Sequence, residues 1–156
     1  MRVTKAEEYG VRLVMRLATS GRQLTVREIA ESERLPEPTV AKVIAELRRA
    51  GVVEAERGRN GGYCLAVSPD ELTLAGVVAA FDEPLYDRGF CDRYGPEGLP
   101  CVRTSACGLR PVWRGLTAVV SQFLSQITVA DLLRGDRPAA PAAPMTSLPV
   151  VGGAES

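Results

Sequence analysis

The order of the periodic patterns in residues 3–67 constrains the fold of this chain more than any other sequence feature. Three stretches have apolar residues at helical spacing, and two short stretches of β-strand type follow them directly. The five stretches are residues 3–19, a short one through Ile29 and Ala30, residues 38–50, residues 52–57 and residues 63–67. The sequence GRNGG joins the last two and suits a hairpin turn, because glycine and asparagine tolerate positive φ. Three helices followed by a hairpin predict a winged helix-turn-helix, a mainly α fold with a small β-hairpin.

Boundary signals support the second and third helices. Thr25 and Glu28 have the spacing of a capping box, in which the hydroxyl and the carboxylate satisfy free backbone donors at a helix start. The two prolines of LPEP suit a turn or a first helical turn before the third helix. One narrow core-facing stripe is predicted in that helix from Val40, Val43, Ile44 and Leu47.

The N-terminal part of the chain carries its basic excess. The whole sequence has 19 basic and 19 acidic residues, but residues 1–67 hold twelve Lys and Arg against nine Asp and Glu. In a winged helix-turn-helix, the second helix of the pair enters the major groove, and the wing contacts the neighbouring backbone or minor groove. The sequence therefore predicts DNA contacts from Thr39 and Lys42 and from the wing residues Arg57, Arg59 and Asn60. The alternative is that these charges only keep a surface soluble.

The residues after the hairpin predict two more apolar helices. The first spans 73–81, with Leu74, Val77, Val78 and Phe81 on its buried face. The second carries the longest apolar stripe of the chain, from Leu109 to Ile127. Such a stripe exceeds what a small core can absorb, which predicts that the helix pairs with a second copy in a homodimer that reads a palindromic DNA site. The alternative is a helix buried wholly within its own subunit.

The end of the chain changes composition. Thr128 and Asp131 repeat the capping pattern and predict a short helix that ends near Leu133. Ala, Pro and Gly dominate from Gly135 onward, which is typical of a disordered tail. We therefore expect a DNA-binding domain in 1–67, a cysteine segment with a dimerisation helix in 68–134, and a disordered tail in 135–156.

Three cysteines lie close together in a segment rich in Gly and Pro. Nine residues separate Cys91 from Cys101, and five separate Cys101 from Cys107, so a flexible chain could direct all three thiols to one point. Thiolates suit a soft metal or an iron–sulfur cluster. The chain has no histidine, so a fourth ligand would be a carboxylate, Cys64, a small molecule or solvent. Free thiols, or a disulfide with one cysteine left over, remain the alternative, and Cys64 is expected to be a small buried residue of the wing.

The remaining features bear on compartment and chemistry. No stretch approaches the length of a membrane span, and the N-terminus lacks the apolar core of a signal peptide, so we expect a cytoplasmic protein with reduced thiols. A thiol oxidoreductase is disfavoured, because the chain lacks a C-x-x-C motif, a histidine general base and an alternating strand and helix pattern.

Several segments together resemble the Rrf2 family of bacterial winged-helix regulators. They are MRVTK at 1–5, LRRAGVV at 47–53, RGRNGGY at 57–63 and the three cysteines before a long helix, so the resemblance covers residues 1 to about 134. It implies a homodimeric transcription factor, by expectation a repressor, with one iron–sulfur cluster per subunit. By position, the cluster ligands would be Cys91, Cys101 and Cys107.

The resemblance is nearest to the nitric-oxide-sensing NsrR-type members, in which a carboxylate on the partner's first helix completes the cluster site. Glu8 stands at that position, and its alternative role is an exposed ion pair with Arg12. A 4Fe–4S cluster that senses nitric oxide, redox state or iron is favoured over a 2Fe–2S redox centre. A zinc or thiol sensor without a cluster is the further alternative.

Overall fold

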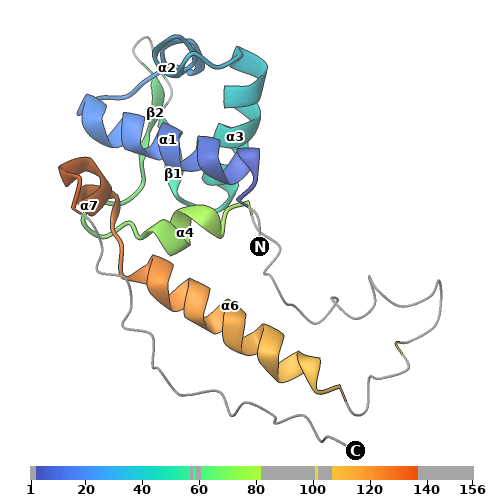
Figure 1. Ribbon diagram of the computed structural model, residues 1–156. Coiled ribbons are helices and arrows are strands. Elements are labelled where there is room, and N and C mark those ends of the chain that lie inside the picture. Colours follow the sequence, from blue (N-terminus) through green and yellow to red (C-terminus); the bar gives the residue numbers. More distant parts are fainter. Residues whose placement is uncertain (1–2, 57, 59–60, 82–100, 102–106, 137–156) are drawn as a thin grey trace, which may run out of the picture.

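The computed structural model describes residues 3–56, 58, 61–81, 101 and 107–136 (Figure 1). Its elements follow in the order α1 (Lys5–Ser20), α2 (Val26–Glu33), α3 (Glu37–Arg49), β1 (Val53–Glu56), β2 (Gly62–Leu65), α4 (Leu74–Val78), α6 (Leu109–Ser125) and α7 (Val129–Arg134). This order confirms the predicted mainly α fold with a small hairpin. The tip residues 57, 59 and 60, together with Cys91 and residues 137–156 of the predicted tail, lie outside the described residues.

Helix α1 begins later than the sequence pattern predicted. Thr4 is its N-cap, because the Thr4 hydroxyl accepts a hydrogen bond from the backbone N–H of Glu7 and the Glu7 carboxylate accepts one from the backbone N–H of Thr4. This capping box leaves Val3 outside the helix, where it is 67 % exposed. The predicted start of the first helix at residue 3 was therefore wrong by two residues. At the other end, Gly21 closes α1 in the left-handed conformation with φ of 62°.

Helix α3 matches its predicted range of 38–50 to within one residue at each end, and α2 begins at its predicted capping box. Thr25 and Glu28 form the expected capping box at the start of α2. Arg34 ends α2 with φ of 55°, and Pro36 is the N-cap of α3. The predicted core-facing stripe of α3 is confirmed, because all four of its residues are buried: Val40, Val43, Ile44 and Leu47.

The hairpin docks on the turn between α1 and α2. Its two antiparallel strands pair Val53 with Leu65 and Glu54 with Cys64. Leu24 forms an isolated bridge to Tyr63, with backbone hydrogen bonds of 3.0 and 2.8 Å. Gly62 permits this approach, because a Cβ at that position would lie 2.8 Å from the carbonyl oxygen of Leu24. Cys64 was expected to be buried, but it is half-buried on the exposed side of this thin two-stranded sheet.

One apolar core holds the N-terminal helices, the hairpin and α4 together. Its fully buried side chains are Leu13, Val14, Ile29, Val40, Ile44, Leu47, Val53, Val77 and Val129. Helix α4 packs against both α1 and α6, and α7 packs against α1. Helix α4 is shorter than the predicted 73–81 helix, because it ends at Val78, although Phe81 still packs against the core. The predicted cap of α7 by Thr128 and Asp131 is confirmed.

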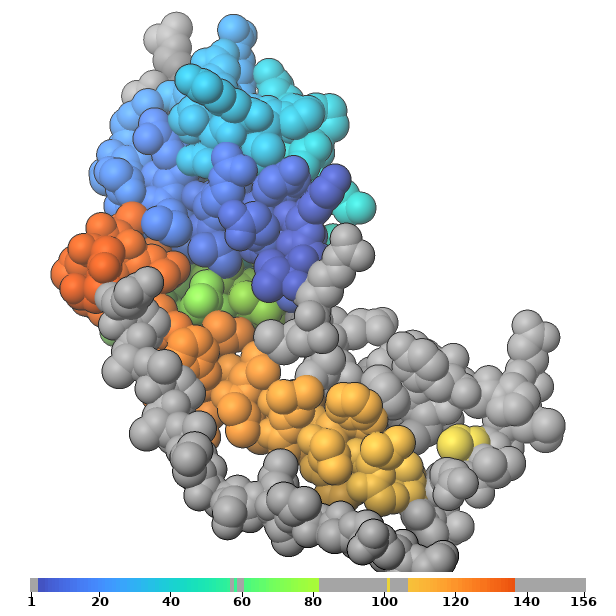
Figure 2. All heavy atoms as spheres, in the orientation of Figure 1, coloured from blue at the N-terminus to red at the C-terminus, as the bar shows by residue number. Residues whose placement is uncertain are grey.

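Helix α6 extends away from this core (Figures 1 and 2). None of its residues is buried in the part of the chain that the structure describes. Four apolar residues on one side are 59, 58, 40 and 57 % exposed, in the order Leu109, Val112, Leu116 and Val119. The alternative in which this helix is buried wholly within its own subunit was therefore wrong. No helix among the described residues is both long and apolar enough to cross a bilayer.

Candidate functional site

Helix α3 has one buried side and one exposed side. Its exposed residues are one acid at the helix start, Glu37, and then small and basic residues, namely Pro38, Ala41, Lys42, Ala45, Arg48 and Arg49. The two alanines leave the helix backbone accessible, and Lys42 and Arg48 form no ion pair with any described residue. Arg49 forms an ion pair with Glu46 on the same helix. Small side chains beside cations allow a helix to approach the floor of the major groove while its charges meet phosphates.

The structure places the predicted DNA-binding residues of α3 at different depths. Lys42 is exposed, as expected, whereas Thr39 is half-buried in the first turn. Sequence reasoning missed Arg48. The signal was available, because Arg48 follows exposed Ala41 by seven residues, which is two helical turns. The predicted wing residues Arg57, Arg59 and Asn60 lie outside the described residues, so their role stays a prediction.

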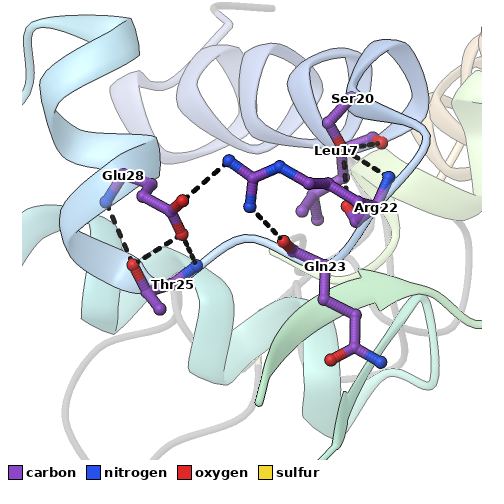
Figure 3. A network of polar contacts seen from close by, with 6 residues as sticks. All are labelled: Leu17, Ser20, Arg22, Gln23, Thr25 and Glu28. Carbon is purple, nitrogen blue, oxygen red and sulfur yellow. Dashed lines mark hydrogen bonds and ion pairs between the residues drawn. The ribbon is translucent and has the colours of Figure 1, made fainter. Parts of the chain in front are cut away.

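Polar contacts hold the corner between α1 and α2, which positions the helix-turn-helix (Figure 3). The guanidinium of Arg22 donates to Glu28 Oε1 at 2.7 Å and to the carbonyl of Gln23 at 2.9 Å. The backbone N–H of Thr25 donates to Glu28 Oε2 at 2.8 Å. The hydrogen bonds from Thr25, together with the guanidinium of Arg22, lower the pKa of Glu28 to about 2. Glu28 is therefore ionised at neutral pH and fixes the start of α2.

A second polar contact joins α1 to the end of α2. Arg12 Nε donates to Glu33 Oε2 at 3.1 Å, and Arg12 Nη2 donates to the backbone carbonyl of Glu33 at 2.7 Å. The Arg12 guanidinium also lies 5.8 Å from the centre of the Tyr9 ring. The predicted ion pair between Glu8 and Arg12 was therefore wrong, because Arg12 turns toward α2. Glu8 is exposed, and its side chain forms no hydrogen bond or ion pair with a described residue.

The candidate cysteine ligands are only partly described. Cys101 and Cys107 are half-buried, and neither forms a disulfide with a described residue. Cys107 directly precedes Gly108, the N-cap of α6, so this helix fixes one end of the cysteine segment. Among the described residues, no three Cys, Asp or Glu side chains gather closely enough to hold a metal ion. A single chain therefore does not bring Glu8 together with Cys101 and Cys107.

Cys64 lies apart from these thiols, in the hairpin. Its Sγ is 3.6 Å from Oε1 of Glu54 on the facing strand. Partial burial, and then the nearby Glu54 carboxylate, raise the pKa of the Cys64 thiol. A thiol that is disfavoured as thiolate is a poor metal ligand and a slow nucleophile.

Comparisons with known proteins agree with this geometry. The family model Rrf2, described as an iron-dependent transcriptional regulator, matches residues 3–135. The transcriptional regulator NsrR of Shouchella clausii is 31 % identical over 135 residues, which cover 85 % of this chain and 89 % of that protein. The solved structure of IscR from T. potens has a TM-score of 0.66 at 26 % identity and covers 88 % of this chain and 89 % of that one.

A more distant structure supports the fold alone. CymR, the global cysteine regulator of B. subtilis, has a TM-score of 0.67 at 22 % identity over 88 % of this chain and 99 % of that one. The family match and the sequence relatives are transcriptional regulators, which agrees with the expectation that the chain is not an enzyme.

Proposed function

This chain belongs to the Rrf2 family of DNA-binding transcriptional regulators, and we propose that it acts as a homodimer whose affinity for its operator depends on an iron–sulfur cluster. The observation that carries the DNA-binding part is the exposed side of α3, where two alanines and two cations without an ion pair to any described residue, Lys42 and Arg48, lie opposite a buried stripe. On this proposal, Lys42 and Arg48 contact DNA from the major groove, and Arg57, Arg59 and Asn60 contact the flanking backbone or minor groove.

The uncovered side of α6 supports a homodimer. Leu109, Val112, Leu116 and Val119 follow one another at intervals of three, four and three residues, which is the spacing of a helix-pairing seam. The adjoining apolar residues Trp113, Val120 and Leu124 are half-buried, so the helix already uses one part of its apolar surface within its own subunit. A second α6 related by a two-fold axis would cover the other part. Two α3 helices would then face a palindromic operator.

The donors in this chain fit an iron–sulfur cluster better than a hard cation. Half-buried thiols at Cys101 and Cys107 are soft ligands, and Glu8 offers an exposed carboxylate without a described partner. We infer that Cys91, Cys101 and Cys107 of one subunit hold the cluster together with Glu8 of the partner subunit. That arrangement accounts for a Glu8 that does not gather with the described Cys101 and Cys107 of its own chain. When bound, the cluster would supply a centre that reacts with nitric oxide or oxidants, or that is lost when iron is scarce.

The residues of the chain would convert the state of this centre into DNA affinity. While the cysteine segment and the partner's α1 share ligands, the two subunits keep one relative orientation, and with it one distance between the α3 helices. Release of Glu8 from the cluster would allow the distance between the two α3 helices to change. Each tenfold change in operator affinity needs only about 1.4 kcal/mol. We favour a 4Fe–4S cluster that senses nitric oxide. Its oxygen ligand would hold iron less firmly than a fourth sulfur would, so the cluster would be open to attack.

Cofactor content is tested on protein purified without air. Iron and sulfide are counted and the visible spectrum is recorded for the wild type and for Cys101→Ser and Cys64→Ser. We expect the wild type and Cys64→Ser to hold about equal iron and sulfide, and Cys101→Ser to hold little. A band that bleaches with nitric oxide supports the 4Fe–4S form, and structured air-stable bands support the 2Fe–2S form. Colourless wild-type protein that contains zinc or no metal would contradict the cluster.

DNA binding by α3 is tested with an operator selected by the protein from random duplexes. Replacing Lys42 or Arg48 with Ala should weaken binding and reduce the slope of log affinity against log salt by about 0.9 for each phosphate that the variant no longer neutralises. Arg16→Ala is the matched control, because it removes an exposed cation from α1 and leaves α3 intact. If the α3 variants bound with the wild-type slope while Arg16→Ala did not, DNA would contact a different face.

A further inference from the structure

Gly10 lies buried near the middle of α1, and the aromatic ring of Phe81 packs directly against its Cα. A Cβ built at this position would overlap ring atoms of Phe81 and would lie 2.5 Å from its Cζ. Glycine is the poorest helix former after proline, so a glycine in a helix interior calls for a packing reason. The Phe81 ring, pressed against the bare backbone of α1, supplies that reason.

Phe81 stands where the described chain enters the cysteine segment. Its N–H donates to the carbonyl of Val78 at 3.0 Å, so it is held just beyond the last turn of α4. It packs on the edge of the core and is the last described residue before 82–100, which contain Cys91. The ring therefore holds the last described residue before the cysteine segment against α1.

On α1, Gly10 lies between two residues with other roles. Glu8, two positions earlier, is the exposed carboxylate that we assign to the partner's cluster. Arg12, two positions later, holds both the side chain and the backbone carbonyl of Glu33 at the end of α2. Glu33 is followed directly by Arg34, whose left-handed conformation begins the turn from α2 into α3. A shift of α1 at Gly10 would therefore reach the turn between α2 and α3 through the hydrogen bonds from Arg12 to Glu33.

We propose that Phe81 is a positioning residue whose ring, seated over Gly10, couples the cysteine segment to α1 and thereby to the DNA-binding helices. This inference rests on the proposed cluster-dependent function and adds the contact through which that dependence passes within one subunit. A flat ring against a helix backbone resists sliding in a way that a flexible aliphatic contact does not, since both surfaces are rigid.

The packing part is tested in cluster-free protein, so its result does not depend on the cofactor. Gly10→Ala, Phe81→Ala and the double variant form a double-mutant cycle in thermal unfolding. We expect Gly10→Ala to lower the melting temperature and to do so much less when Phe81 is already Ala. Gly115→Ala is the matched control, because it lies inside α6 with no atom within 4 Å of the added Cβ, and it should raise the melting temperature. Additive effects in the cycle would overturn the inference.

The coupling part is tested by the ratio of operator affinities with and without the cluster, measured below the melting temperature of every variant. The variant is Phe81→Ala, or Phe81→Leu if the alanine variant does not fold. Without the cluster, we expect it to bind DNA as tightly as the wild type does. The logarithm of its affinity ratio should be at most half of the wild-type value. Val78→Ala, which truncates a half-buried side chain at the end of α4 three residues before Phe81, should keep the ratio. A wild-type ratio in both Phe81 variants would overturn the coupling, whereas a ratio of one in the wild-type protein itself would contradict the proposed function.

Discussion

At the scale of single residues, the charged side chains of α1 and α2 have separate tasks. Glu28 and Arg22 close the corner before α2, and Arg12 and Glu33 close the end of α2. Both pairs keep α2 in place beside α3 without using Lys42 or Arg48, the cations that we propose contact DNA. Glu8 stands outside both pairs, which leaves its carboxylate available to another chain.

Glu28 predicts a defined acid sensitivity. Its pKa is about 2 in the folded protein, compared with about 4.3 for an ordinary Glu carboxyl. Ionised Glu28 therefore stabilises the fold above the ordinary value, and that contribution is lost as the pH falls toward 2. We expect Glu28→Gln to have a lower melting temperature than the wild type at pH 7 and to converge with it as the pH approaches about 2, as followed by circular dichroism.

Glu31→Gln is the control for this measurement. It removes a carboxylate from the same helix, where Glu31 pairs with Arg27 on the exposed surface at 2.9 Å. Exposed pairs contribute little to stability, so its melting temperature should stay near that of the wild type from neutral pH downward. A pH-independent difference between Glu28→Gln and the wild type would contradict the role assigned to the Glu28 charge.

At the scale of elements, α6 is the helix with the most exposed apolar side chains among the described residues. One part of its apolar surface contacts its own subunit, and the seam from Leu109 to Val119 contacts nothing that the structure describes. We predict that Leu116→Glu weakens the homodimer at least about 100-fold, because symmetry buries two unpaired charges in the interface. Analytical ultracentrifugation measures the dissociation constant, and circular dichroism confirms that the helix content is retained.

Ala118→Glu is the matched control on α6. It introduces the same charge on the exposed side opposite the Leu116 seam. The control should stay dimeric and bind the operator as the wild type does. If both variants dimerised normally, the homodimer would use another surface.

Local signals predicted the elements well, whereas long-range packing escaped them. Thr25, Thr128 and the α3 stripe act within a few residues of their own helix, so the sequence alone was sufficient to place them. The partner of Arg12 could not be predicted, because Glu33 comes from a different helix 21 positions later. Cys64 was expected to be buried, but the sheet has only two strands and leaves this residue half-buried. The seat of Phe81 on Gly10 likewise depends on how α4 lies against α1.

At the scale of the whole molecule, the proposed cluster site is built from two chains. Mixed dimers of Glu8→Gln and Cys101→Ser subunits test this directly. If Glu8 acts on the partner's cysteines, such a heterodimer contains one intact ligand set and should hold about half the iron of the wild type. Each variant homodimer should hold little. If Glu8 acted within its own chain, the heterodimer would be as empty as the two homodimers.

On this proposal, the cluster on the cysteine segment governs how tightly the dimer binds DNA. The decisive quantity is the anaerobic affinity of wild-type protein for its selected operator, measured by fluorescence anisotropy before and after treatment with nitric oxide. We expect at least a tenfold loss of affinity on treatment and no change for Cys101→Ser, whose affinity should match that of the treated wild type. Equal affinity of treated and untreated wild-type protein, with cluster loss confirmed by the spectrum, would contradict a cluster-governed switch.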